Sequence, residues 1–112
     1  MKAYPIGFNP SYSEANPTLE DVNKLCGYGF LEFGAPWCEH CVAAATPIEH
    51  VLTPLQLPHI KAYDGKGLPL GRAFKIKLWP TLVLLKDGVE LARVVRPTSI
   101  SDIKPLIDLI PS

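Results

Sequence analysis

The sequence has 112 residues, enough for one domain around a single hydrophobic core. Apolar residues make up 47% and charged residues 20%, and eleven basic residues balance eleven acidic ones. This composition is that of an ordinary globular protein, and it gives no sign of electrostatic binding to nucleic acid or an anionic membrane. No stretch approaches the ~18 apolar residues of a membrane span, and the N-terminus lacks a signal peptide's apolar run, so we expect a cytoplasmic monomer.

The predicted elements follow an irregular arm over residues 1–17, in the order helix, strand, helix, strand, helix, β-hairpin and helix. Their expected bounds are Thr18–Leu25, Tyr28–Phe33, Cys38–Leu52, His59–Tyr63, Arg72–Lys75, Thr81–Leu85 with Val89–Val95, and Ser101–Ile110. The arm also has room for a short strand at Ala3–Ile6.

Local signals support the helices. Thr18 is an N-cap residue with an acidic residue three positions on, which is typical of a capping box. Pro47 lies inside the second helix and should kink it, while Pro105 is tolerable only in the first turn of the last helix. A 3.6-residue rhythm predicts the inward face of the second helix, with these members: Cys41, Ala44 or Ala45, Ile48, Val51 and Leu52.

Strands that alternate with helices predict a parallel strand pair, because the helix carries the chain back across the sheet. Lys86-Asp87-Gly88 predicts a tight hairpin, which adds antiparallel strands. We therefore expect one α/β domain over residues 1–112, with a mixed central β-sheet covered by helices on both faces.

Cys38 and Cys41 are two residues apart at the start of a predicted helix, so both can reach one disulfide. The helix N-terminus favours the thiolate form of Cys38, and the thiolate is the species that attacks a disulfide. Cys41 lies one turn into the helix and would resolve the mixed disulfide. Two alternatives are that the cysteines only pack, or that they bind a metal; a typical zinc site needs a second ligand pair, which the sequence lacks.

The segment Trp37-Cys38-Glu39-His40-Cys41, after an apolar strand, resembles the WCxxC motif of the thioredoxin family. Trp79-Pro80-Thr81 resembles that family's second signature, a cis proline followed by Thr, and the hairpin turn falls at the matching place. The resemblance covers about residues 30–95, and it implies a thioredoxin fold and thiol–disulfide oxidoreductase activity.

The same resemblance implies a site. Cys38, Cys41, Pro80 and Glu32 would be catalytic, with Glu32 as a proton-transfer group and Lys61 as its possible partner. The backbone N–H and C=O of Trp79 would face an extended substrate chain. The residues expected to contact substrate are Trp37, Trp79, Thr81, Glu39 and His40. The implied partners are protein disulfides and a reductase or other dithiol electron donor, and no cofactor or metal is expected.

Glu39-His40 departs from the usual middle residues of the motif. His40, if cationic, would make the disulfide more oxidising, whereas Glu39 would act in the opposite direction. Leu78 and Arg96 replace small residues on the expected substrate-facing surface. An alternative function is therefore a non-catalytic binding module whose docking face is built from Trp79, Pro80, Leu78 and Arg96.

Other residues have structural interpretations. We expect Cys26 to be a buried small hydrophobe, with a regulatory thiol as the alternative. His50 and His59 are expected on the surface, and the aromatic residues Tyr4, Phe8 and Tyr12 are expected to anchor the arm.

Overall fold

A four-stranded sheet with the order β2-β1-β3-β4 forms the centre of the computed structural model, which describes residues 6–12, 17–65 and 68–111. The strands are β1 (Tyr28–Gly34), β2 (His59–Tyr63), β3 (Thr81–Lys86) and β4 (Val89–Val95). β1 pairs with β2 in parallel and with β3 antiparallel, and β3 pairs antiparallel with β4. The predicted mixed sheet is confirmed.

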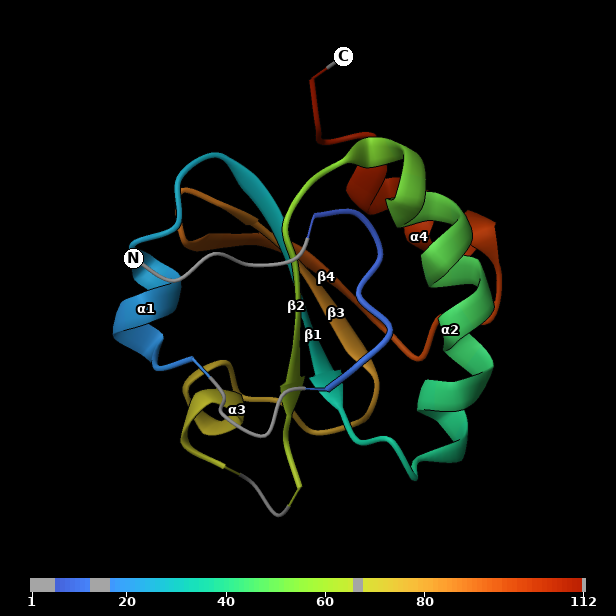
Figure 1. The fold of residues 1–112 in the computed structure, drawn as a ribbon, viewed down its shortest axis with the longest axis horizontal. Helices are drawn as coiled ribbons and strands as arrows, with labels where there is room; N and C mark the ends of the chain where they lie inside the picture. The colour runs from blue at the N-terminus through green and yellow to red at the C-terminus, as the bar shows by residue number, and fades with distance from the viewer. Residues whose placement is uncertain (1–5, 13–16, 66–67, 112) are drawn as a thin grey trace.

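The helices are α1 (Leu19–Asn23), α2 (Glu39–Leu52), α3 (Pro69–Ala73) and α4 (Ile100–Ile107), with a 3₁₀ turn η1 (Thr53–Leu55) after α2. Figure 1 shows α2 and α4 on one side of the sheet and α1 and α3 on the other. The expectation of helices on both faces is therefore confirmed as well. None of the helices in the described ranges is long and apolar enough to cross a membrane.

Alternation along β1 divides the core into two layers, because successive side chains of a strand point to opposite faces. Leu31 and Phe33 join the layer beside α1 and α3, and Phe30 joins the layer beneath α2 and α4. Glu32 has the same parity as Phe30. Its carboxyl group is therefore placed in the α2 layer, inside the protein.

The α2 helix presents one apolar face to this layer. Its buried residues are Cys41, Ala44, Ile48 and Leu52, so Ala44 rather than Ala45 is the inward alanine. Val51 is only partly buried. Pro47 lies within the helix, as expected.

Three predicted helices differ from the observed ones by two residues or more at an end. α1 ends at Asn23 rather than at Leu25. α3 begins at Pro69, where a proline without an N–H fits the first turn, and ends at Ala73. α4 ends at Ile107 and begins at Ile100, after a capping box formed by Ser99 and Asp102. Pro105 therefore lies beyond the first turn, contrary to the prediction, on the exposed side of the helix.

The N-terminal arm passes along the α2 side of β2. Ile6 forms an isolated bridge with Pro58, and the Gly7 N–H donates to the Leu57 carbonyl at 2.9 Å. Residues 3–5 of the suggested strand, Tyr4 among them, lie outside the described residues. The arm carries Phe8 and Tyr12 into contact with the rest of the domain, as expected for anchoring residues.

Candidate active site

Cys38 is the N-cap residue of α2, so the helix begins immediately after the first cysteine of the motif. Its sulfur accepts the backbone N–H of Cys41 at 3.4 Å, and its own N–H donates to the Ala35 carbonyl at 3.2 Å. The sulfur is therefore at the positive end of the helix dipole, where negative charge is stabilised. Both cysteines are free thiols, which is the reduced state.

Cys41 is one turn further into α2 and only 5% exposed. Burial, opposed in part by a hydrogen bond from the Ala35 backbone, raises the pKa of the Cys41 thiol to about 11. A hydrogen bond with Tyr12 acts in the lowering direction as well. Cys41 therefore stays protonated at neutral pH until something removes its proton.

Two tryptophans lie beside the dithiol. The Trp37 and Trp79 rings meet edge to face, with centroids 5.4 Å apart, and Trp37 is 65% exposed. The Trp79 indole N–H donates to Asp64 Oδ2 at 2.9 Å. Asp64 is buried, and its Oδ1 has no hydrogen-bond partner among the described residues. The carboxylate thus fixes the orientation of Trp79, while Trp37 remains open to a partner.

The loop that precedes β3 contributes the other side of the site. The peptide bond between Trp79 and Pro80 is cis. The Thr81 side chain is 1% exposed, and its hydroxyl donates to the Leu78 carbonyl at 2.7 Å. The Thr81 side chain is turned inward and holds this loop, so the predicted contact of Thr81 with substrate would have to come from its backbone.

Arg96 occupies part of the surface expected to meet substrate. Its Nε–H donates to the Trp79 carbonyl at 2.8 Å, and its backbone N–H donates to the Pro80 carbonyl at 2.8 Å. We expected the Trp79 carbonyl to be free for a substrate chain, but it already accepts a hydrogen bond from Arg96. Its second lone pair can still accept another hydrogen bond. Arg96 is exposed, so its guanidinium adds a positive charge next to the two tryptophans.

Glu32 is 1% exposed, and its partner is His59 rather than Lys61. Glu32 Oε1 and His59 Nε2 are 2.8 Å apart. His59 Nδ1 accepts the backbone N–H of Asn9 at 2.8 Å, so a neutral imidazole carries its proton on Nε2 and donates it to Glu32. His59 is fully buried, which corrects the prediction of a surface residue.

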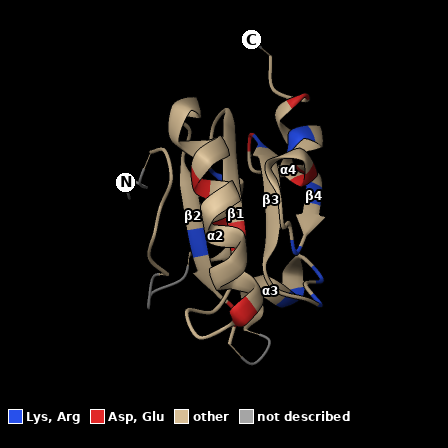
Figure 2. Ribbon diagram, turned by 90° about the vertical axis from the view of Figure 1, so that its right-hand side faces the viewer, with Lys and Arg blue, Asp and Glu red and all other residues tan. Residues whose placement is uncertain are grey.

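Lys61 is buried beside this pair but is directed elsewhere. It is the register partner of Glu32 in the parallel ladder, and Figure 2 shows the basic segment of β2 next to the acidic segment of β1. Its ammonium donates to the Pro10 carbonyl at 3.3 Å and lies 4.3 Å from the centre of the Tyr12 ring. Lys61 therefore fastens the arm to the sheet.

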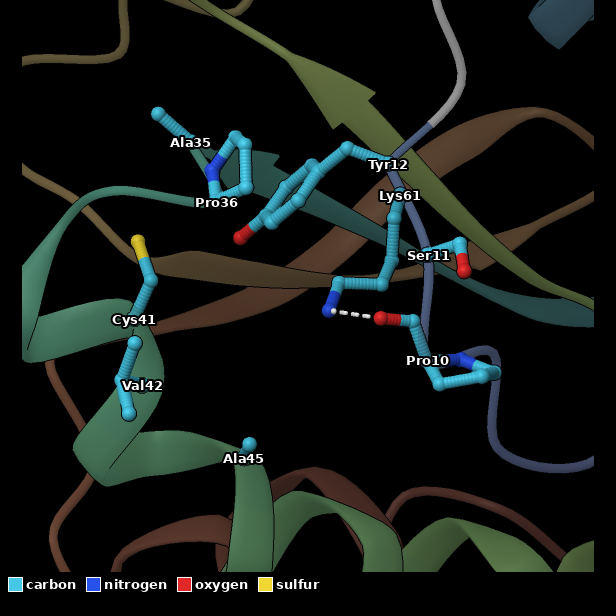
Figure 3. A pocket seen from close by; sticks show the side chains of 9 residues that line it. All are labelled: Pro10, Ser11, Tyr12, Ala35, Pro36, Cys41, Val42, Ala45 and Lys61. Atoms are coloured by element: carbon cyan, nitrogen blue, oxygen red, sulfur yellow. Dashed lines mark hydrogen bonds between the residues drawn. The ribbon is translucent and has the colours of Figure 1, made fainter.

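The arm brings Tyr12 between Glu32 and Cys41. The Tyr12 hydroxyl donates to Glu32 Oε2 at 3.4 Å and shares a hydrogen bond with the Cys41 thiol. A cavity of about 420 Å³ opens beside these groups, between the arm and α2, with Lys61 at its wall. Figure 3 shows the Tyr12 hydroxyl directed toward the Cys41 side of this cavity.

Glu39 and His40 are both exposed in the first turn of α2, where a substrate could reach them. Cys26 is exposed rather than buried, and the nearest polar contact of its sulfur is the Lys24 carbonyl, 3.9 Å away. Within the described ranges, no group of three His, Cys, Asp or Glu side chains is placed to bind a metal ion.

From the sequence alone, three residues of the site have no such role: Tyr12 is expected only to anchor the arm, His59 to lie on the surface, and Asp64 is not singled out. A signal existed for His59, since a parallel partner strand in register puts its side chain on the face of Glu32. No local signal placed Tyr12, because its position depends on where the arm crosses the sheet.

A dithiol at a helix N-terminus, packed against a proline loop on a mixed sheet, is the arrangement of a thiol–disulfide redox protein. The thioredoxin family model matches residues 12–108. The chain belongs to the thioredoxin family.

Individual relatives agree with this assignment. Thioredoxin 2 from Pseudomonas aeruginosa PAO1, solved in its reduced form, is 41% identical, with a TM-score of 0.79 over 90% of this chain and 94% of that chain. Thioredoxin of Chlamydia pneumoniae is 33% identical over 73 residues, which are 62% of this chain and 69% of the relative. Probable protein disulfide-isomerase A4 of Caenorhabditis elegans is 36% identical over 58 residues, 52% of this chain.

Several curated relatives are much longer than this chain. The match covers 9% of the Caenorhabditis elegans protein and 21% of a protein disulfide-isomerase from Datisca glomerata. The thioredoxins and protein disulfide-isomerases among the relatives support a thiol–disulfide oxidoreductase role for this family member.

Proposed function

We propose that this protein catalyses thiol–disulfide exchange with protein substrates, acting chiefly as a reductant. The observation that carries the proposal is the asymmetry of the dithiol. Both cysteines are largely buried, but Cys38 caps α2 with its sulfur at the positive end of the helix, whereas Cys41 has a raised pKa that keeps it a thiol. In this proposal the Cys38 sulfur attacks the substrate disulfide, and the Cys41 sulfur attacks later, in the resolving step.

Each step follows from this asymmetry. The Cys38 thiolate attacks a substrate disulfide, forms a mixed disulfide and releases one substrate sulfur as a thiolate. Cys41 then loses its proton and attacks Cys38 Sγ. The bond to the substrate breaks, the electron pair leaves on the second substrate sulfur, and the Cys38–Cys41 disulfide forms. Glu32 is the buried group proposed to receive the Cys41 proton.

The substrate would dock on the exposed surface around the dithiol. Trp37 offers an apolar face, and Leu78 is exposed next to the loop of Trp79 and Pro80. Arg96 adds a positive charge there, while Glu39 and His40 flank Cys38. An electron donor with a reactive dithiol would reduce the protein again through the same surface.

The test is reduction of a model protein disulfide with dithiothreitol as the electron source. Cys38→Ser should abolish the accelerated reduction, and Cys41→Ser should accumulate a mixed disulfide that mass spectrometry detects on Cys38. Cys26→Ser is the matched control, because it removes an exposed thiol distant from the site. Unchanged turnover in both active-site variants would refute the proposal.

A redox titration against glutathione tests the direction of electron flow. A potential near about −270 mV supports the reductant, and one near about −180 mV supports an oxidant or isomerase. The alternative of a binding module is favoured by the exposed Trp37 and Leu78. It predicts that Cys38→Ser leaves partner binding unchanged and that the wild-type protein shows no turnover.

A further inference from the structure

Resolution of the mixed disulfide requires a group that takes the proton of the Cys41 thiol, and neither cysteine of the pair provides one. Cys41 is buried and must lose its proton before it can attack the mixed disulfide. Glu32 lies on β1, the strand that precedes α2, and the structure places Tyr12 between Glu32 and Cys41. The Tyr12 hydroxyl donates a hydrogen bond to Glu32 Oε2 at 3.4 Å and is also hydrogen-bonded with the Cys41 thiol.

Gly34 shows how closely these groups approach each other. A Cβ atom at this position would lie 2.4 Å from the Tyr12 hydroxyl oxygen and 2.6 Å from Cys41 Sγ. Both atoms therefore sit over the same glycine, at the end of β1, two residues after Glu32. The hydroxyl fills the space that a side chain at position 34 would take.

We propose that Tyr12, from the N-terminal arm, relays the proton between Cys41 and Glu32 during resolution of the mixed disulfide. The inference rests on the proposed function. The Cys41 thiol gives its proton to Tyr12 Oη while the Tyr12 hydroxyl proton moves to Glu32 Oε2. The Cys41 thiolate then forms its bond to Cys38 Sγ as the bond from Cys38 to the substrate sulfur breaks, and the substrate sulfur leaves with the electron pair.

The surroundings of Tyr12 keep its hydroxyl neutral, so it can pass a proton on without holding a charge itself. Burial, with the nearby Glu32 carboxyl group, raises the pKa of Tyr12 well above its usual value, so the hydroxyl stays neutral. His59 holds Glu32 Oε1, which leaves Oε2 directed toward Tyr12. Lys61 lies over the Tyr12 ring and fixes the arm through the Pro10 carbonyl.

The titratable groups around the Cys41 thiol come from several elements: Cys38 of α2, Tyr12 of the arm, Glu32 of β1, and His59, Lys61, Tyr63 and Asp64 of β2 and its C-terminal end. A change in the pH dependence of Cys41 must therefore be assigned by variants. Tyr12→Phe removes only the hydroxyl and keeps the ring that packs against Lys61.

The resolving step can be observed alone in a Cys26→Ser background. Cys38 is converted to a mixed disulfide with a chromophoric aromatic thiol, and release of that thiol reports the attack by Cys41. In Tyr12→Phe, release at pH 7 should be slower by about tenfold or more, a modest part of what a positioned proton-transfer group contributes. The deficit should shrink as the pH approaches the Cys41 pKa, because hydroxide then removes the proton directly.

Two further variants separate a relay from a structural role. Tyr28→Phe is the matched control, since Tyr28 also lies under a lysine but on the far end of β1, and its release rate should be unchanged. In a Glu32→Gln background the relay has no acceptor, so Tyr12→Phe should then have little further effect. Urea unfolding of each variant measures whether the arm and core remain stable.

The outcomes are distinct. Equal rates for Tyr12→Phe and wild type across the pH range, with rapid release by both, overturn the relay and leave the exchange function standing. A Tyr12→Phe deficit that persists unchanged in the Glu32→Gln background also overturns the relay, since Tyr12 would then act only through structure. Failure of wild-type Cys41 to release the thiol at any pH refutes the proposed function itself.

Discussion

Replacing His59 with Leu should destabilise the fold strongly, because it removes the hydrogen-bond donor to the buried Glu32 Oε1. His59 is fully buried and Glu32 is 1% exposed, so water cannot take the place of the lost N–H donor. Breaking a buried pair by removing one partner costs about 3–5 kcal/mol. The Asn9 N–H also loses its acceptor, but Asn9 is partly exposed and can bond to water. A total of about 4 kcal/mol would take up much of the stability of a typical small domain, about 5–15 kcal/mol.

Glu32→Leu should cost less, about 1–3 kcal/mol, because it leaves an unpaired neutral imidazole N–H instead of a carboxyl group. The double variant removes both polar partners and replaces them with apolar groups, which can be close to neutral. The free energies of unfolding should therefore be non-additive, with a coupling energy of about 2 kcal/mol or more.

Urea denaturation at pH 7 in reducing buffer, followed by circular dichroism, measures the four free energies of the cycle. The exposed ion pair Glu90–Arg93, with atoms 2.6 Å apart, provides a matched cycle whose coupling should stay below about 1 kcal/mol. Additivity at Glu32 and His59 within about 0.5 kcal/mol would refute the reasoning, since it would mean that the pair carries no shared free energy.

Three further predictions follow from single sites. Because burial raises the pKa of Cys41 from 9.0 to about 11, the folded state holds this proton more tightly, and stability should fall as pH rises through that range. This loss should be absent in Cys41→Ala. If the free energy of unfolding from urea denaturation falls equally with pH in both proteins, the prediction is contradicted. Ile48→Ala should cost about 2–5 kcal/mol in the same assay, because Ile48 is fully buried in the α2 layer, and a loss below 1 kcal/mol would contradict its core role. In Asp64→Ala, the Trp79 indole N–H should exchange with solvent faster by NMR than in Asp64→Asn, which keeps an acceptor, whereas equal rates would exclude the Asp64 hydrogen bond.

Short-range patterns in the sequence determined most of the architecture. The spacing of Cys38 and Cys41, the apolar rhythm of α2 and the Asp87-Gly88 turn are all encoded within a few residues, so periodicity and turn chemistry predicted them. Errors of a few residues arose at the ends of α1, α3 and α4. α3 starts with Pro69 as its first helical residue, and α4 starts after the N-cap residue Ser99.

Only the tertiary structure decided how the dithiol is supported. Asn9 is 50 residues from His59, and Tyr12 is 20 residues from Glu32. No local rule joins positions so far apart: the parallel register of β1 and β2 and the path of the arm bring them together. Cys26 shows the reverse case, since its residue type favours burial but its place just before β1 leaves it in solvent. The sequence by itself thus determined where the two thiols lie on α2, whereas the packing of distant segments decided which polar groups surround Cys41.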